Sequence, residues 1–286
     1  MIDFTRLAYR IFGRISRSLR VYFFDIKEEL HKANINYTIE EYLSIAFLTC
    51  TITFVLENVF LSFIFGFFST PLLSAFLSFT LSLALTALLF FLFYTYPATM
   101  AQNREGKIKK ALPFAVSYMS TISSAKVPPI VLFETLAKFE EYGEVTGEAK
   151  AMVRDVNVFG MTFSSALIKQ AKRTPSKDFR ELLWGINTVV ASGGDLTMFL
   201  KQKEEELMNT YRGRIRKYAQ DLSLFVEVYL TLIITGSIFF IVLSSIINSI
   251  SGGLGTTAVQ SFVVFILLPL LSIGFIIIIK SISPLE

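Results

Sequence analysis

Residues 72–96 read LLSAFLSFTLSLALTALLFFLFYTY and contain no Asp, Glu, Lys or Arg. A helix of about 20 apolar residues crosses the roughly 30 Å of hydrocarbon in a bilayer, so this stretch is long enough to span a membrane. Three further apolar runs of similar length occur at residues 42–68, 222–247 and 258–279. With a mean hydropathy of +0.57, the chain is predicted to be a polytopic all-α membrane protein with four transmembrane helices.

The basic residues predict the orientation of these helices. Of the 27 Lys and Arg, seven lie in residues 1–32, nineteen between residues 100 and 222, and the last is Lys280. The short loops at 66–71 and 248–257 carry no charge. The positive-inside rule therefore places both termini and the central segment in the cytoplasm of a multi-pass cell-membrane protein. We read the net charge of +4 as a product of this topology, so no nucleic-acid partner is expected. No cleavable signal peptide is expected, because the first apolar run begins only after forty residues.

Four segments follow from this pattern: a basic N-terminal segment (1–41), transmembrane helices 1 and 2 (42–96), a cytoplasmic helical domain (97–221) and transmembrane helices 3 and 4 (222–286). In the N-terminal segment, apolar residues recur every three or four positions between Phe4 and Leu30, and arginines take the other faces. This is an amphipathic helix, which fits either an anionic inner leaflet or a contact with the cytoplasmic domain. Periodicity does not choose between these two surfaces.

Helix breakers divide the cytoplasmic domain into about six helices. The expected starts are after Pro113, after Pro128-Pro129, near Gly147, at Thr162, at Thr174-Pro175 with Thr174 as N-cap, and at Asp195. The last of these helices either continues through Arg212-Gly213 into the third apolar run or bends there, because Gly weakens a helix interior.

A turn motif recurs in this domain. The stretch GMTFSSAL at 160–167 aligns with GGDLTMFL at 193–200, and AKVPPIVL at 125–132 is a weaker third copy. We expect Gly160 and Gly193 to supply left-handed helix caps, with Gly194 completing the turn and Asp195 starting the next helix. The domain would then consist of three helix-turn-helix units.

Residues that commonly carry catalysis are scarce. The glycines at 193 and 194 are not followed by the Lys-Ser or Lys-Thr of a phosphate-binding loop. His31 is the sole histidine and Cys50 the sole cysteine, so a metal site built from several histidines or several thiolates cannot be assembled within one chain. We predict a protein that is not an enzyme and that uses no cofactor and no metal.

Three polar residues lie within or next to apolar runs: Glu57 and Asn58 in the first, and Glu227 in the third. Acids inside a membrane often mark ion pathways, so a small transporter or channel is the alternative function. Glu57 is expected to face protein rather than lipid, because a lipid-facing carboxylate is costly.

The chain resembles the type II secretion F-domain family. The resemblance rests on ELHKANINYTIEEYLS (29–44), LPFAVSYMSTISSAKVPPIVLFETLA (112–137) and FGMTFSSALIKQAKRTPSKDFRELLWGINTVVASGGDLTMFLKQKEEEL (159–207). The family's Gly-Gly turn is matched by Gly193 and Gly194, and its mid-domain glycine by Gly160. Ala125-Lys126 departs from the pattern, where the family often has Ala-Gly.

What the resemblance implies is a non-enzymatic inner-membrane platform protein of type IV pili, archaella, Tad pili or type II secretion systems. With a single F domain, the chain is similar to the short archaeal or Tad-type form. Such a protein is expected to contact a cytoplasmic secretion ATPase and membrane-embedded pilin-like or archaellin-like subunits. It is also expected to pair with a second copy of itself or with another F-domain protein.

Overall fold

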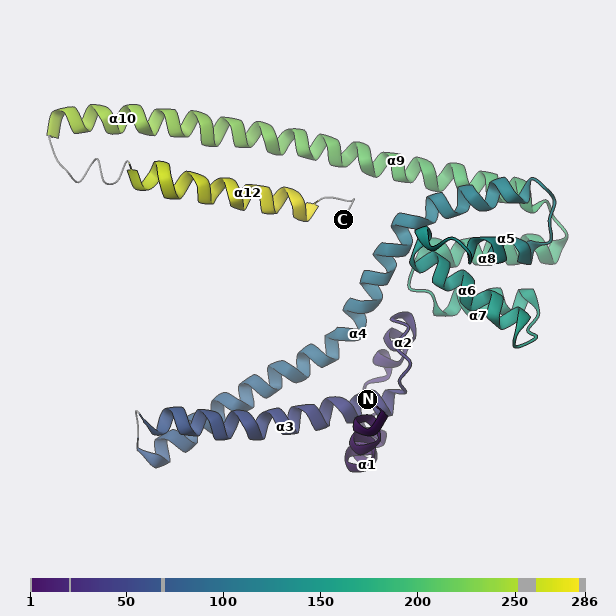
Figure 1. Cartoon of the computed structure of the whole chain (residues 1–286), viewed down its shortest axis with the longest axis horizontal. Coiled ribbons are helices and arrows are strands. Elements are labelled where there is room, and N and C mark those ends of the chain that lie inside the picture. The colour runs from purple at the N-terminus through teal and green to yellow at the C-terminus, as the bar shows by residue number, and fades with distance from the viewer. Residues whose placement is uncertain (1, 21, 68–69, 252–260, 283–286) are drawn as a thin grey trace. The chain divides into compact units, whose positions relative to one another are not determined.

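The computed structural model describes residues 2–20, 22–67, 70–251 and 261–282 (Figure 1). Every regular element in these ranges is helical, which confirms the predicted all-α class. The chain divides into two compact units, Met1–Glu204 and Glu205–Glu286.

Two long helices form an antiparallel hairpin in the first unit. Helix α3 (Ile39–Gly66) opens with a capping box in which Thr38 and Glu41 satisfy each other's backbone N–H groups. Helix α4 (Pro71–Ser123) places Pro71 at its first position, where the missing N–H costs nothing. Most apolar side chains of the hairpin are exposed, as expected of helices that face lipid.

Helix α4 does not end where the apolar run ends. It continues through Pro97 and Pro113 to Ser123, so the predicted helix start after Pro113 is wrong. A proline inside a helix removes one hydrogen bond, and packing must offset that loss. The residues around Pro113 provide such packing, since Ile108, Leu112, Ala115, Val116 and Met119 are all buried.

The N-terminal segment forms two helices, α1 (Ile2–Leu19) and α2 (Phe24–Lys32), rather than a single one. The break lets the ring of Phe23 pack edge-on against Phe90 and Tyr94 of α4, with centroids 6.1 and 6.0 Å apart. Because no Gly or Pro marks the break, only this tertiary packing accounts for it. Helix α1 packs against α3, and Ser16 Oγ donates to the carbonyl oxygen of Glu40 at 2.8 Å.

Four shorter helices complete the first unit: α5 (Pro129–Leu136), α6 (Glu144–Asn157), α7 (Phe163–Arg173) and α8 (Lys177–Ser192). The 3-10 turn Glu140–Tyr142 precedes α6. Thr162 caps α7, as its position before the apolar stripe indicates. The start predicted for α8 is wrong by two residues, because Ser176 accepts from the Phe179 N–H and Thr174 instead ends α7.

Three turns gather at one end of this helical domain: residues 124–128, 158–162 and 193–195. Helices α7 and α8 are antiparallel neighbours joined by a short link, so the start of α7 lies near the end of α8. Thr197 Oγ1, in the first turn of α9, donates to the Ser123 carbonyl at the end of α4 at 2.8 Å. We call this end of the domain the turn end.

Helix α9 (Leu196–Tyr229) starts in the first unit and enters the second. It passes Gly213 without ending, continues as the π-helical residues Leu230–Thr235, and is followed by α10 (Gly236–Ser251). The second unit also contains the π-helical stretch Val263–Leu267 and α12 (Leu268–Ile282). Tyr229 contacts this last helix, with its hydroxyl 3.2 Å from Ser272 Oγ and its ring 4.8 Å from that of Phe275.

Three helices in the described ranges are long and apolar enough to cross a membrane: α3, α4 and the run Leu196–Ile247. The remaining apolar helix, Val263–Ile277, falls in a shorter class than these three, although its helical turns continue to Ile282. The predicted count of four is therefore met only in part. The uncharged loops at 66–71 and 248–257 lie partly outside the described residues.

Candidate functional site

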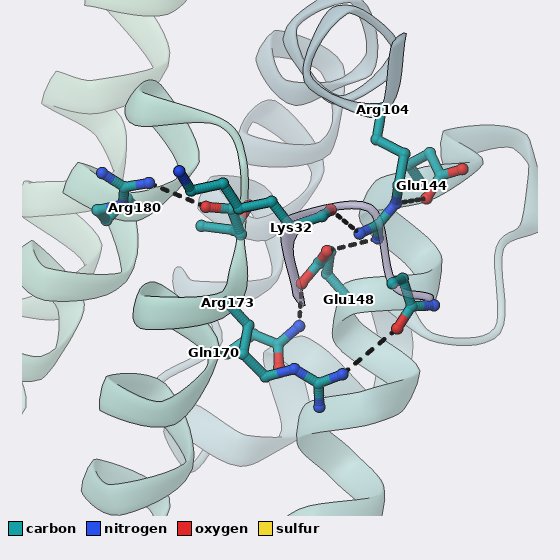
Figure 2. A network of polar contacts seen from close by, with 9 residues as sticks. Lys32, Arg104, Glu144, Glu148, Gln170, Arg173 and Arg180 are labelled. Carbon is teal, nitrogen blue, oxygen red and sulfur yellow. Dashed lines mark hydrogen bonds and ion pairs between the residues drawn. The ribbon is translucent and has the colours of Figure 1, made fainter. Parts of the chain in front are cut away.

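A buried arginine joins three segments that are distant in sequence (Figure 2). Arg104, on α4, donates from Nε to Glu144 Oε2 at 2.9 Å and from Nη2 to Glu148 Oε1 at 2.8 Å. Its Nη1 donates to the carbonyl oxygen of Lys32, at the end of α2, at 2.6 Å. The planar guanidinium suits this role because its donors point in several fixed directions. We call these four residues the Arg104 junction.

Glu148 is the most deeply buried acid of the junction, with 3% of its side chain exposed. Burial raises the pKa of its carboxyl, and the nearby Arg104 and Arg173 guanidinium groups act in the opposite direction. Gln170, on α7, also donates from Nε2 to the second carboxylate oxygen (Figure 2). Glu148 is thus held by neighbours from α4 and α7, which is the condition under which a buried carboxylate is tolerated.

One further hydrogen bond and two buried polar atoms lie beside the junction. Arg173 Nη2 donates to Asn34 Oδ1 at 3.3 Å, and Asn34 has a φ of +57°, a left-handed conformation that Asn tolerates better than most residues. The Gln170 Oε1 and Thr174 Oγ1 atoms are buried without a hydrogen-bond partner. Native structures contain few such atoms, and both can accept a hydrogen bond from water.

The junction is built to hold segments together. It ties the α2–α3 connection and the continuation of a membrane-length helix to α6 and α7. Its groups are one guanidinium, two carboxylates and a backbone carbonyl, and they lack a nucleophile paired with a base. Within the described residues, no three His, Cys, Asp or Glu side chains come close enough together to hold a metal ion.

The residues of the turn motif lie at the turn end. Gly160 and Gly193 have φ values of +66° and +68°, and Gly193 caps α8 in the left-handed conformation. Asp195 Oδ1 accepts from the N–H groups of Thr197 at 2.9 Å and Met198 at 3.1 Å. Gly194 does not have a positive φ, and its N–H donates to the Val189 carbonyl.

In the third copy of the motif, the left-handed residue is Lys126, with φ +53°, rather than the aligned Ala125. The turn is therefore displaced by one residue from the alignment. A left-handed lysine is strained relative to glycine at the same position.

The polar residues of the first apolar run face α4. Thr86 Oγ1 donates to Glu57 Oε2 at 3.5 Å, a long contact, and Asn58 Nδ2 donates to Ser82 Oγ at 3.2 Å. Both side chains are partly buried between the two helices. Glu227 is exposed on α9, in the second unit.

The sequence patterns did not identify the Arg104 junction or a close approach between α8 and α9. A Cβ placed on Gly185 would lie 2.2 Å from Phe199 Cζ, so only glycine leaves room for this ring. A glycine inside an otherwise apolar helical stripe is the one signal that could have indicated the contact. The partners of Arg104 are 40 and 44 residues away, and no local pattern connects them.

Comparison with known proteins gives several matches that cover about half of the chain. Two matches bear the printed name flagella accessory protein J. The one from Methanocaldococcus jannaschii is 24% identical over 153 residues, which is 53% of this chain and 27% of that protein. The one from Methanococcus voltae is 25% identical over 145 residues, which is 50% of this chain and 26% of that protein.

An uncharacterised protein of Methanocaldococcus jannaschii is 26% identical over 163 residues, which is 57% of this chain and 27% of that protein. The matched region is therefore about a quarter of the length of these relatives. No solved structure matches the chain. Residues 115–244 match the model of the family described as type II secretion system (T2SS), protein F. This match covers 130 of the 286 residues, so the chain contains a segment that is similar to the domain of this family.

Proposed function

We propose that this chain is a non-enzymatic platform protein of the cytoplasmic membrane in an archaellum-like or type IV pilus-like assembly machine. Its helical domain would receive motion from a cytoplasmic secretion ATPase, and its apolar helices would pass that motion to pilin-like subunits. The observation that carries the proposal is the family match over residues 115–244, which runs from the end of α4 into α10. It therefore includes the helical domain and an adjoining membrane-length helix.

The turn end is the surface that we assign to the ATPase. Val158, Phe159 and Met198 are exposed there by 72%, 64% and 73%, although all three are apolar. Exposed apolar side chains that lie together often mark a protein-binding surface. Glu144 of the Arg104 junction and Asn157 next to the turn end stand at opposite ends of α6, which separates the two places by about 20 Å. The ATPase would then dock on the side of the domain away from α2.

Site-specific cross-linking tests this assignment. A photo-reactive amino acid replaces Phe159 in the full-length chain, which is co-expressed with the secretion ATPase encoded nearest to it. The matched control carries the same probe at Lys107, an exposed position on α4. We expect a cross-linked ATPase band from position 159 and none from position 107. Co-purification without any difference between the positions would contradict the surface assignment, and absence of both cross-linking and co-purification would contradict the platform role.

The proposed topology has four spans, with the termini and residues 97–221 in the cytoplasm. Single cysteines at Thr70 and Lys110, in a Cys50→Ser background, test it directly. A membrane-impermeant maleimide should label position 70 on intact cells and should label position 110 only after lysis. Labelling of position 110 on intact cells would reverse the orientation.

A transporter or channel that uses Glu57 and Glu227 is the alternative, and no observation favours it. Glu57 has a hydrogen-bond partner on α4, and Glu227 is exposed on a helix of the other unit. Paired broken helices, which are typical of transporter sites, are not a feature of α3 or α4 in their described residues.

A further inference from the structure

A cavity of about 730 Å³ opens beside the start of α3. The α2–α3 connection forms one wall and the last turns of α7 form another. Five basic side chains line it: Arg20, Lys27, Lys169, Lys172 and Arg173. The only lining carboxylate is that of Glu40, so the cavity has a clear excess of positive charge.

Ion pairs neutralise part of this positive charge. Arg20 Nη1 lies 3.1 Å from Glu40 Oε1, which neutralises the one acid in the wall. Lys169 Nζ lies 2.8 Å from the buried Asp155 Oδ1. Lys172 is exposed at the cavity, and Arg173 reaches Asn34 across it at 3.3 Å. Helices α2 and α7 present their carbonyl ends here and α3 presents its N-terminus, so the helix dipoles oppose one another and the basic side chains supply most of the attraction for an anion.

The cavity is amphiphilic rather than uniformly polar. Ile35, which is half-buried, and Tyr37, with 38% of its surface exposed, contribute apolar surface, while Leu30 and Ile39 belong to the packed core behind them. A free phosphate would need only the cations. An apolar wall next to a basic one instead suits a ligand that has a phosphate and a hydrocarbon part.

The cavity lies at the point along α3 where a lipid headgroup would be expected. Ile39 and Glu40 form the first turn of this membrane-length helix, and the apolar run begins at Tyr42. At 1.5 Å per residue the cavity is within about 5 Å of the start of the hydrocarbon-spanning sequence. Tyrosine is common at this level of a membrane protein.

Helix α1 ends one residue before Arg20, and its exposed apolar face also indicates that the cavity lies at the level of the lipid headgroups. It packs on α3 through the buried Ala8 and Ser16 and leaves Leu7, Ile11 and Ile15 about half exposed. Arginines occupy other positions of this helix. Such a face fits an anionic leaflet, which places the basic cavity beside lipid phosphates.

We propose that this cavity binds the phosphate of an anionic phospholipid headgroup, with the first part of the lipid chains against Ile35 and Tyr37. Basic side chains of α7 would then contact the bilayer surface through a bound lipid. The proposal concerns a lipid site and does not depend on the filament role.

Lipid titration of the full-length protein in a neutral detergent tests the site, with bound molecules counted by native mass spectrometry. The ligands are a short-chain phosphatidylglycerol, a phosphatidylcholine of the same chain length, and glycerol phosphate without chains. We expect the phosphatidylglycerol to bind most tightly. Lys172→Gln should weaken its binding about fivefold, the effect of one basic residue near an anionic membrane surface.

Lys110→Gln, the same change at an exposed position on α4 outside the cavity, is the matched control and should leave binding unchanged. Circular dichroism melting of both variants checks that they fold as the original chain does. Equal binding by the Lys172→Gln and Lys110→Gln variants would overturn the site. Binding of glycerol phosphate as tight as that of phosphatidylglycerol would assign the cavity to a soluble phosphate and overturn the lipid as its source.

Discussion

Replacing Arg104 by Met tests whether the buried junction holds the helical domain to the long helix α4. The substitution keeps a long side chain and removes the charge and all three hydrogen-bond donations. It leaves Glu148, with 3% of its side chain exposed, without its main counter-charge. Removing one partner of a buried ion pair typically costs about 3–5 kcal/mol, and we expect a loss in this range at pH 7. Loss of the ion pair between Arg104 and Glu144 adds little to this free-energy cost, because the Glu144 side chain is 29% exposed and water can solvate it.

The loss should depend on pH in a defined direction. Burial already raises the pKa of Glu148 above 4.5, and Arg104 opposes that rise, so the variant should have a still higher Glu148 pKa. An acid with a raised pKa in the folded state contributes stability below its unfolded pKa and loses it as pH rises through the folded value. The Arg104→Met variant should therefore be closest to the original chain near pH 4.5 and fall behind it as the pH increases.

Urea unfolding of the full-length protein in detergent measures this effect. Trp184, the only tryptophan, lies on α8 and reports on the helical domain. Lys110→Met serves as the control, since it removes an exposed cation from the same helix. Adding Glu148→Gln to Arg104→Met should recover part of the loss at pH 7. A loss below about 1 kcal/mol, or an equal loss at pH 5 and pH 8, would refute the reasoning.

Three other substitutions have defined outcomes. Gly185→Ala should destabilise the domain by about 1–3 kcal/mol in the same unfolding assay, because the new Cβ would overlap the Phe199 ring; an unchanged midpoint would show that the ring moves aside freely. Asp195→Ala should cost about 1 kcal/mol through loss of the α9 cap, and Asp195→Ser should retain most of it; equal losses would argue against capping. Glu57→Leu should lower the thermal midpoint of the detergent-solubilised chain more than Glu57→Gln, which keeps an acceptor for Thr86; the interhelical bond should contribute about 1 kcal/mol, and identical midpoints would contradict it.

The helical class and the membrane character could be predicted from the sequence because they depend on local patterns. Long uncharged runs leave few alternatives to membrane-length helices, and a glycine followed by a capping residue ends one helix and starts another. Thr162 and the helix start after Asp195 were accessible in this way. Local rules fail where packing decides, as at Pro113, which local chemistry places in a first turn and which the buried neighbours keep inside α4.

The Arg104 junction could not be predicted because none of its residues stands out in the sequence on its own. Arg104 lies in a stretch rich in basic residues, and Glu144 and Glu148 are spaced like acids on a solvated helix face. Only the packing of α6 against α4 removes Glu148 from water and places both acids opposite the arginine. The basic cavity is similar, since its cations come from α7 and from the N-terminal helices.

Because α4 runs unbroken from its apolar run to Ser123, the orientation of the helices that follow it depends on the number of residues in α4. Inserting one alanine between Pro97 and Arg104 would turn everything beyond it by about 100° and advance it by about 1.5 Å. Arg104 and α6 would then turn together away from the Lys32 carbonyl at the end of α2, while every residue of the junction kept its neighbours in the sequence. Four inserted alanines would return the helix to within about 40° of its original orientation, yet lengthen it by about 6 Å. The length of α4 therefore sets the distance between its apolar run and the helices that pack on its last turns. Short insertions in this helix should be far less tolerated than substitutions on its exposed face.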